Sequence, residues 1–386
     1  MSRFLAPFAL LLAVPAHAIV PDPGAVRPAI PTAAEAPVAL LVDLTSGQVL
    51  HARNPDRRFM PASVTKVMTL YLAFELIKAG RLDPQQVFTV RPEVSRIWRR
   101  KGSTMYLDTG EQVRVEDLLL GIANVSANDG AAVLGDGQAG SVAAWTSEMN
   151  RVAWSLGMTG SHFNSPNGFP DEGKTFTTAN DLVTLARALI TRHPDKFGYY
   201  IGRIGFNYKG IAQLNHDPMI GRVPGADGIK TGFTNESGFS YLGTARRNGQ
   251  RLVLVLAGVE NGRLRAKLAK SYVEWGFAAF ERKQLFAPGA VVGEARVQDG
   301  SARSIALKAA GPVAINLPRG STPELTATIR YDGPLRAPIA AGQEVAVLEV
   351  TAPGVAPARV PLYAAQAVGT AGPLDRIVNA VAGLFS

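Results

Sequence analysis

The segment from Ser63 to Ala79, SVTKVMTLYLAFELIKA, is apolar on nearly every face of the helix that it predicts. Pro61 precedes it, and Gly80 stands where a left-handed residue commonly ends a helix. A helix without a polar face has to be enclosed by other elements, so the fold must surround it. Ser63 and Lys66 are then polar groups at the start of a buried helix, where they are costly unless they have a function.

The elements around this helix are typical of an α+β domain. Two antiparallel hairpins are predicted, residues 39–44 with 48–51 and residues 239–245 with 251–258. Between them lies a predicted helix at 115–123 that breaks into a polar loop and then resumes. A last helix is indicated by apolar residues at helical spacing, namely Leu264, Leu268, Tyr272, Phe277 and Phe280. We expect a domain over 38–283 in which one antiparallel sheet lies beside a helical subdomain.

The remaining chain has a different sequence pattern. Short predicted strands at 304–307, 313–317, 325–331 and 344–350 are separated by Gly, Pro and Asp turns. This pattern indicates a small all-β sandwich domain over 284–366. A length of 386 residues also favours two domains, and 47% hydrophobic against 18% charged residues indicates a folded protein.

Both ends of the chain carry targeting signals. Residues 1–18 combine Arg3, an apolar run and Ala16-His17-Ala18, which predicts a secretory signal peptide followed by a Pro- and Ala-rich linker at 19–37. The tail at 367–386 contains an amphipathic helix over 373–386, for which we favour a peripheral membrane contact over a helix docked on the second domain. We therefore expect an exported protein, in a periplasm or at the outer face of the cytoplasmic membrane.

The composition excludes several kinds of chemistry. The chain has no cysteine, and its five histidines show no metal-ligand spacing, so we expect neither a metal nor a cofactor. The formal net charge of +9 is compatible with a plain basic surface or with attraction to anionic lipids or wall polymers. Nucleic acid is excluded as a partner by export.

Three short motifs carry the chemistry: Ser63-Val64-Thr65-Lys66, Ser126-Ala127-Asn128 and Lys230-Thr231-Gly232. Each is weak alone, and their joint order is much stronger evidence. Ser63 and Lys66 lie one helical turn apart, so a lysine whose pKa is lowered by burial can activate the serine hydroxyl. The alternative, an N-cap serine with a surface lysine, fits poorly because the helix has almost no polar face.

The other two motifs suit a substrate. Ser126 and Asn128 lie in the polar loop, where an extended backbone would point both into one cleft, or where they serve only as turn residues. The Lys230 and Thr231 side chains, on a predicted edge strand, suit a carboxylate. Gly232 would let a peptide approach the backbone and add as a further strand.

The three motifs, with their order and spacing, resemble those of the penicillin-recognising serine enzymes, and in particular the low-molecular-mass D-alanyl-D-alanine carboxypeptidases. The resemblance covers roughly residues 35–280 and implies a β-lactamase/transpeptidase-like fold. It implies a penicillin-sensitive carboxypeptidase of cell-wall biogenesis and cell shape, which removes the terminal D-alanine from peptidoglycan pentapeptide stems and is acylated by β-lactam antibiotics.

The same resemblance implies residue roles. Ser63 would form the acyl-enzyme, Lys66 would take its proton, and Ser126 would relay a proton to the leaving D-alanine. Lys230 and Thr231, followed by Gly232, would hold the terminal carboxylate, and Asn128 would bind the substrate amide. The backbone N–H groups of Ser63 and Phe233 would form the oxyanion hole.

Two alternatives stay open. A D,D-endopeptidase of the same fold would cut cross-links rather than trim stems, and a non-catalytic wall- or penicillin-binding module would keep the pocket without turnover. Efficient β-lactamase activity is disfavoured, because the second motif reads Ser-Ala-Asn and no Glu-x-x-Leu-Asn stretch follows it.

Overall fold

The computed structural model describes residues 30 and 35–372. The described chain forms two compact units, one comprising 35–42 and 51–276 and the other 43–50 and 277–372. The predicted signal peptide and the predicted helix at 373–386 lie outside the described residues. No helix among the described residues is both long and apolar enough to cross a bilayer.

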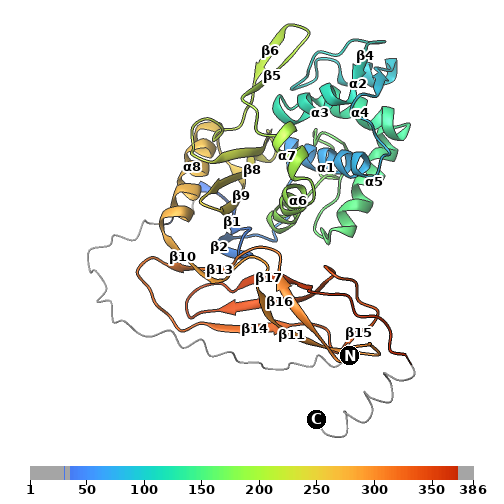
Figure 1. Ribbon diagram of the computed structural model, residues 1–386. Coiled ribbons are helices and arrows are strands. Elements are labelled where there is room, and N and C mark those ends of the chain that lie inside the picture. Colours follow the sequence, from blue (N-terminus) through green and yellow to red (C-terminus); the bar gives the residue numbers. More distant parts are fainter. Residues whose placement is uncertain (1–29, 31–34, 373–386) are drawn as a thin grey trace, which may run out of the picture. The chain divides into compact units, whose positions relative to one another are not determined.

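An antiparallel sheet forms the centre of the first unit (Figure 1). Its order is β2-β1-β9-β8-β7, so strands from both ends of the predicted domain meet in one sheet. The strands are β1 (Val38–Asp43), β2 (Gln48–Arg53), β7 (Ala226–Thr234), β8 (Gly238–Arg247) and β9 (Gln250–Val259). The third motif therefore lies on β7, at the free edge of the sheet.

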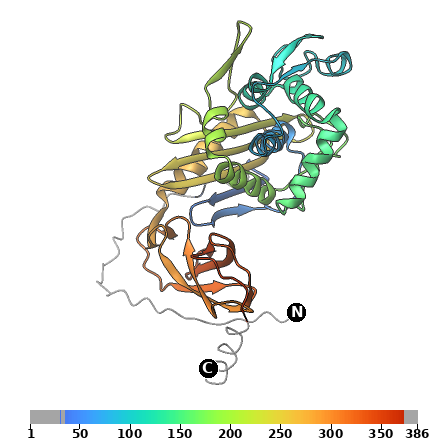
Figure 2. The same ribbon diagram turned by 45° about the vertical axis from the view of Figure 1, so that its right-hand side comes forward.

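Helices cover both faces of this sheet (Figures 1 and 2). On one face, α8 (Gly262–Ala278) packs so closely that a Cβ on Gly276 would lie 2.8 Å from side chains of Leu41 and Leu252. On the other face lie α1 (Lys66–Lys78) and α6 (Ala179–Arg192), which contact β7 and β9 respectively. The sheet is thus buried on both sides, which explains its continuous apolar runs.

The helical subdomain encloses α1. Ten of its thirteen residues are buried, which matches a helix without a polar face. Gly80, with φ +67°, follows the helix in the left-handed conformation. The surrounding helices are α2 (Pro92–Trp98), α3 (Val115–Asn124), α4 (Asn128–Ala139), α5 (Val142–Ser155) and α7 (Pro194–Tyr200). Two small hairpins complete it, β3 (Val87–Thr89) with β4 (Gln112–Arg114), and β5 (Gly205–Tyr208) with β6 (Ile211–Leu214).

The second unit is all-β over its described part. A six-stranded sheet has the order β14-β16-β17-β12-β11-β15, and β10 pairs with β13 in a second sheet. The strands are β10 (Phe280–Phe286), β11 (Val291–Gln298), β12 (Ser304–Ala309), β13 (Val313–Pro318), β14 (Thr326–Arg330), β15 (Leu335–Arg336), β16 (Glu344–Thr351) and β17 (Ala358–Ala364). Their alternating apolar residues, such as Ile305, Leu307, Leu348 and Leu362, form one core.

The fold class is confirmed as mixed α and β followed by an all-β domain, and two local predictions were wrong. Phe280 begins β10 and does not continue α8, because the chain leaves the helix at Ala278. Residues Ala62–Thr65 form a 3₁₀ turn, η2, so the regular α-helix begins only at Lys66. Such turns are frequent at helix N-termini, and they are not visible in hydrophobic periodicity.

Candidate active site

Ser63 lies in the η2 turn that leads into the buried helix α1. The residue before it, Ala62, has φ +50°, an unusual value for a side-chain-bearing residue. The Ala62 carbonyl is closely covered by Gly168, where a Cβ would lie only 1.8 Å from the carbonyl oxygen. Only glycine fits there, so the segment around Gly168 fixes the turn that presents Ser63.

The amine of Lys66 is fully buried and makes three short polar contacts. Its Nζ lies 2.8 Å from Ser63 Oγ, 2.7 Å from Asn128 Oδ1 and 2.8 Å from the backbone oxygen of Asn167. Asn167 is itself completely buried, and its Nδ2 donates to the Asn128 backbone oxygen at 3.3 Å. The serine, the lysine and two asparagines therefore form one connected group.

Burial and neighbouring charges both shift the pKa values of the two lysines in the site. Burial lowers the pKa of Lys66 well below its usual value, and the positive charge of Lys230 lowers it further, while Asp129 opposes the shift. Burial, followed by the charge of Arg265, lowers the pKa of Lys230 to about 7. Both effects favour the neutral form of the Lys66 amine beside Ser63.

Ser126 and Asn128 do not lie in one extended loop, and that part of the prediction was wrong. Ser126 has φ +64°, and Asn128 is already the first residue of α4. The sharp turn still directs both residues to the same cavity. Both polar atoms of the Asn128 side-chain amide form hydrogen bonds within the protein. Oδ1 accepts from Lys66, and Nδ2 donates to the Lys101 backbone oxygen at 2.9 Å.

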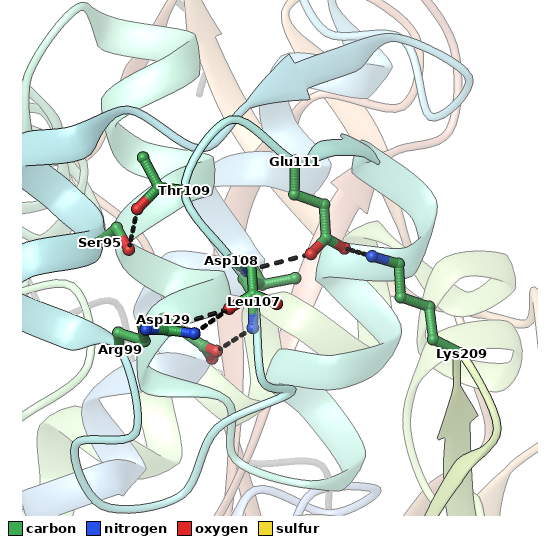
Figure 3. A network of polar contacts seen from close by, with 8 residues as sticks. All are labelled: Ser95, Arg99, Leu107, Asp108, Thr109, Glu111, Asp129 and Lys209. Carbon is green, nitrogen blue, oxygen red and sulfur yellow. Dashed lines mark hydrogen bonds and ion pairs between the residues drawn. The ribbon is translucent and has the colours of Figure 1, made fainter.

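The buried carboxylate of Asp129, directly after Asn128, holds the neighbouring loop. It accepts backbone N–H groups from Met105 at 3.0 Å and from Leu107 at 3.1 Å, and Figure 3 shows it pointing at Leu107. The same loop is fastened further along, where Glu111 pairs with Lys209 at 2.7 Å. The wall of the cleft that contains Gly102 and Ser103 is thus fixed by polar contacts.

The third motif forms another wall. Lys230 and Thr231 are buried on β7, whereas the ring of Phe233 is 51% exposed and packs on Phe239 with centroids 4.2 Å apart. A Cβ on Gly232 would lie 2.4 Å from the Pro61 carbonyl oxygen. Glycine is therefore needed here for packing against the turn before Ser63, in addition to any approach by a peptide.

Two basic residues of the site, His216 and Arg265, were not predicted from the sequence. Both line the cavity, and the charge of Lys230 is one cause that lowers the pKa of His216, after burial. The Arg265 Nε is buried, and among the described residues it has no hydrogen-bond partner. Lys230 and Arg265 thus lie close together at one end of the cleft, an arrangement suited to a carboxylate. Nothing in the local sequence of Arg265 signals this role, because tertiary packing places it.

One cavity of about 480 Å³ joins these groups. Of the predicted residues, those that line it are Ser63, Ser126, Asn128, Thr231, Gly232 and Phe233. Lys66 and Lys230 lie buried behind that wall. No group of three His, Cys, Asp or Glu residues in the described part of the chain is placed to hold a metal ion.

A serine against a buried lysine, beside an edge strand carrying Lys-Thr-Gly, defines a penicillin-recognising serine hydrolase. Comparison with known proteins agrees. Residues 25–261 match the model of the D-alanyl-D-alanine carboxypeptidase family, and residues 280–370 match that of the penicillin-binding protein 5 C-terminal domain. The chain belongs to the D-alanyl-D-alanine carboxypeptidase family, and it is a serine-type D-Ala-D-Ala carboxypeptidase.

Individual relatives support the assignment along most of the chain. D-alanyl-D-alanine carboxypeptidase DacA of Haemophilus influenzae is 31% identical over 90% of each chain, and DacD of Escherichia coli is 30% identical over 88% of each. The structure of penicillin-binding protein 5 from H. influenzae matches with a TM-score of 0.74 at 30% identity, covering 88% of this chain and 99% of that one. Penicillin-binding protein D2 of Listeria monocytogenes, solved in an ampicillin-bound form, matches with a TM-score of 0.57 at 30% identity over 63% of this chain and 97% of its own.

Proposed function

We propose that Ser63 is the nucleophile and Lys66 its general base. The observation that carries this proposal is the 2.8 Å contact between Lys66 Nζ and Ser63 Oγ, in a site that lowers the pKa of the amine. A neutral amine has two hydrogens and one lone pair. The side-chain Oδ1 of Asn128 and the backbone oxygen of Asn167 can accept these two hydrogens. The lone pair is then directed at the Ser63 hydroxyl.

The rest of the cleft serves the substrate. Lys230, Thr231 and Arg265 bind the terminal carboxylate, while the backbone N–H groups of Ser63 and Phe233 stabilise the oxyanion. Ser63 Oγ attacks the carbonyl of the penultimate D-alanine, its proton passes to Lys66, and Ser126 relays a proton to the departing amine. Water then hydrolyses the ester. Asn128 positions the Lys66 amine through its Oδ1 atom. Its Nδ2 atom binds the substrate amide once its hydrogen bond to the Lys101 backbone oxygen is broken.

The substrate is the pentapeptide stem of peptidoglycan, and β-lactams act as covalent inhibitors at Ser63. The family supports this proposal, as does the ampicillin-bound structure of the Listeria relative. The apolar run before Ala16-His17-Ala18 supports export to the periplasmic side of the membrane, where stems are found. The apolar face of 373–386 supports peripheral membrane contact.

The deciding experiment is intact-mass spectrometry of the mature protein after exposure to penicillin, with Ser63→Ala beside it. Release of D-alanine from a D-Ala-D-Ala peptide is followed in parallel. We expect a single adduct and D-alanine release, both lost in the variant. Adduct formation without release would favour the endopeptidase or a binding module, and absence of an adduct would disprove the role of Ser63.

A further inference from the structure

A strongly basic surface continues one wall of the catalytic cavity. Residues 96–101 read Arg-Ile-Trp-Arg-Arg-Lys, with four cations and no acidic residue. The next two residues, Gly102 and Ser103, line the cavity itself. Large apolar groups are also exposed in this part of the chain, since Ile97 is 51% and Tyr106 44% exposed. We call residues 96–101 together with Tyr106 the basic rim.

The basic rim is fixed to the catalytic cleft. Asn128 donates through Nδ2 to the Lys101 backbone oxygen at 2.9 Å, and through its backbone N–H to the Ser103 oxygen at 2.8 Å. The Lys101 ammonium lies 4.5 Å from the centre of the Phe169 ring and 5.3 Å from that of Trp98. These contacts hold the rim at one position beside the cavity.

Two further contacts join α2 to the loop that carries Tyr106. The Thr109 hydroxyl donates to the Ser95 hydroxyl at 2.8 Å, and Arg99 pairs with Asp108 at 2.6 Å (Figure 3). The cations and the exposed apolar groups of the rim therefore belong to one connected surface. A surface that is ordered before binding loses little conformational freedom when a partner arrives, and this favours binding.

Two of the four cations are available to a partner. Asp108 already pairs with Arg99, and the Lys101 ammonium lies against two aromatic rings. By contrast, Arg96 and Arg100 are exposed, and no residue between 35 and 372 forms an ion pair or a side-chain hydrogen bond with either guanidinium. Guanidinium groups beside exposed apolar groups suit an anionic partner that binds carboxylate to arginine.

The place of the basic rim favours one kind of anionic partner. A bilayer held against the rim would cover the wall formed by Gly102 and Ser103, and so restrict entry to the cleft. A polymer that carries the substrate, in contrast, has to pass close to the cleft. Under the proposed function each uncleaved stem ends in a carboxylate, so a polymer with many stems presents a row of negative charges.

We propose that the basic rim anchors the polymer from which the D-Ala-D-Ala stem extends. Arg96 and Arg100 pair with carboxylates of neighbouring stems while Ser63 acts on one stem, and Ile97 and Tyr106 pack against apolar parts of the polymer. Binding at the rim raises the local concentration of stems at the cleft. This proposal rests on the proposed function, because that function makes the polymer the substrate.

The test compares an acetylated peptide that ends in D-Ala-D-Ala with soluble, uncross-linked peptidoglycan strands whose stems have the same end. Release of D-alanine gives kcat/KM per stem. One exposed ion pair changes an equilibrium constant by up to about fivefold, so two should favour the strands by roughly tenfold at low salt. Because salt screens exposed charges, this preference should disappear near about 1 M salt.

Variants assign the preference to the basic rim. Arg96→Gln/Arg100→Gln should abolish it and leave peptide cleavage and the penicillin adduct unchanged, because neither arginine lines the catalytic cavity. Arg96→Lys/Arg100→Lys keeps both charges and should retain most of the preference. Arg81→Gln/Arg222→Gln is the matched control, since it removes the same charge from exposed positions of the same compact unit outside this cavity. This control should keep the full preference.

A binding measurement needs no turnover. Co-sedimentation of the Ser63→Ala protein with insoluble peptidoglycan should weaken by a similar factor when Arg96→Gln/Arg100→Gln is added. The same proteins are sedimented with vesicles of phosphatidylglycerol and phosphatidylcholine, and here the added substitutions should make no difference.

The outcomes separate this proposal from the proposed function. Equal kcat/KM for peptide and strands, or a preference that survives in Arg96→Gln/Arg100→Gln, would overturn the anchoring role. Weaker vesicle binding by that variant with an intact preference for strands would assign the rim to lipid and overturn the role as well. Absence of a penicillin adduct and of all cleavage in the wild type, with rim-dependent binding to peptidoglycan, would overturn the proposed function and leave the anchoring role standing.

Discussion

The positive charge of Lys230 lowers the pKa of Lys66, and only the burial of the Lys66 amine has a larger effect on it. The roles that we propose for these two lysines of one cleft are opposite. Lys66 has to be neutral to accept a proton, whereas Lys230 has to be charged to hold a carboxylate. The counter-charge for Lys230 comes from Asp217, a buried carboxylate to which the Tyr241 hydroxyl donates at 2.9 Å.

Replacing Lys66 by Met tests the base. Met retains an unbranched apolar chain in the buried site but has no amine, so acylation by penicillin should slow by about 10²–10⁴-fold, the usual contribution of a general base. Stopped-flow acylation measures this rate, and circular dichroism checks the fold. Lys78→Met, at the exposed end of the same helix, is the control and should acylate normally. Normal acylation by Lys66→Met would refute the assignment.

The pH dependence of KM reports on Lys230. Because the pKa of Lys230 is lowered to about 7, the group is a cation below this pH and loses its charge as pH rises through it. KM should therefore rise above pH 7, by roughly tenfold, if one charge-assisted hydrogen bond to the substrate weakens. Lys230→Arg keeps its charge and should flatten the rise. A wild-type KM that stays constant from pH 6 to 9 would contradict this role.

Asp129→Asn should loosen the loop beside the catalytic cleft. The amide has a single acceptor oxygen for the N–H groups of Met105 and Leu107, so one donor loses its partner in a buried site. We expect a loss of about 1–3 kcal/mol in the free energy of unfolding and slower acylation. Asp108→Asn, an exposed partner of Arg99 in the same loop, should cost about 0–1 kcal/mol. Urea unfolding compares the two, and equal losses would refute the assigned role.

His193 should make stability depend on pH. Its ring is buried with Nε2 2.6 Å from Glu75 Oε1, and burial lowers its pKa below 6.5. Between the lowered pKa and 6.5 the unfolded chain binds more protons, so stability rises with pH across this window and is lost as pH falls. Urea unfolding at pH 5 and 7 should show a smaller difference in His193→Gln than in the wild type. His162→Gln, at an exposed ring, is the control, and an equal effect there would refute the prediction.

The sequence by itself determined those structural features that depend on residues close together in the chain. Ser63 and Lys66 are three positions apart, and helical geometry alone brings such side chains together. The buried helix, the two hairpins and the all-β end follow from hydrophobic periods that need no knowledge of distant contacts. The same rules failed where a backbone turn decided the outcome, as at Ser126 with φ +64°.

Only the tertiary structure decided which distant groups complete the site. The Asn167 backbone oxygen accepts from Lys66 across 101 residues, and Arg265 reaches the cleft from a helix that follows the sheet. Every residue has a backbone oxygen, so no residue type indicates which one contacts Lys66. Arginine is common on helices, so Arg265 by itself does not indicate a role in the site. The pKa values that separate the roles of Lys66 and Lys230 likewise depend on burial and on charges brought near by folding, and no linear pattern records either.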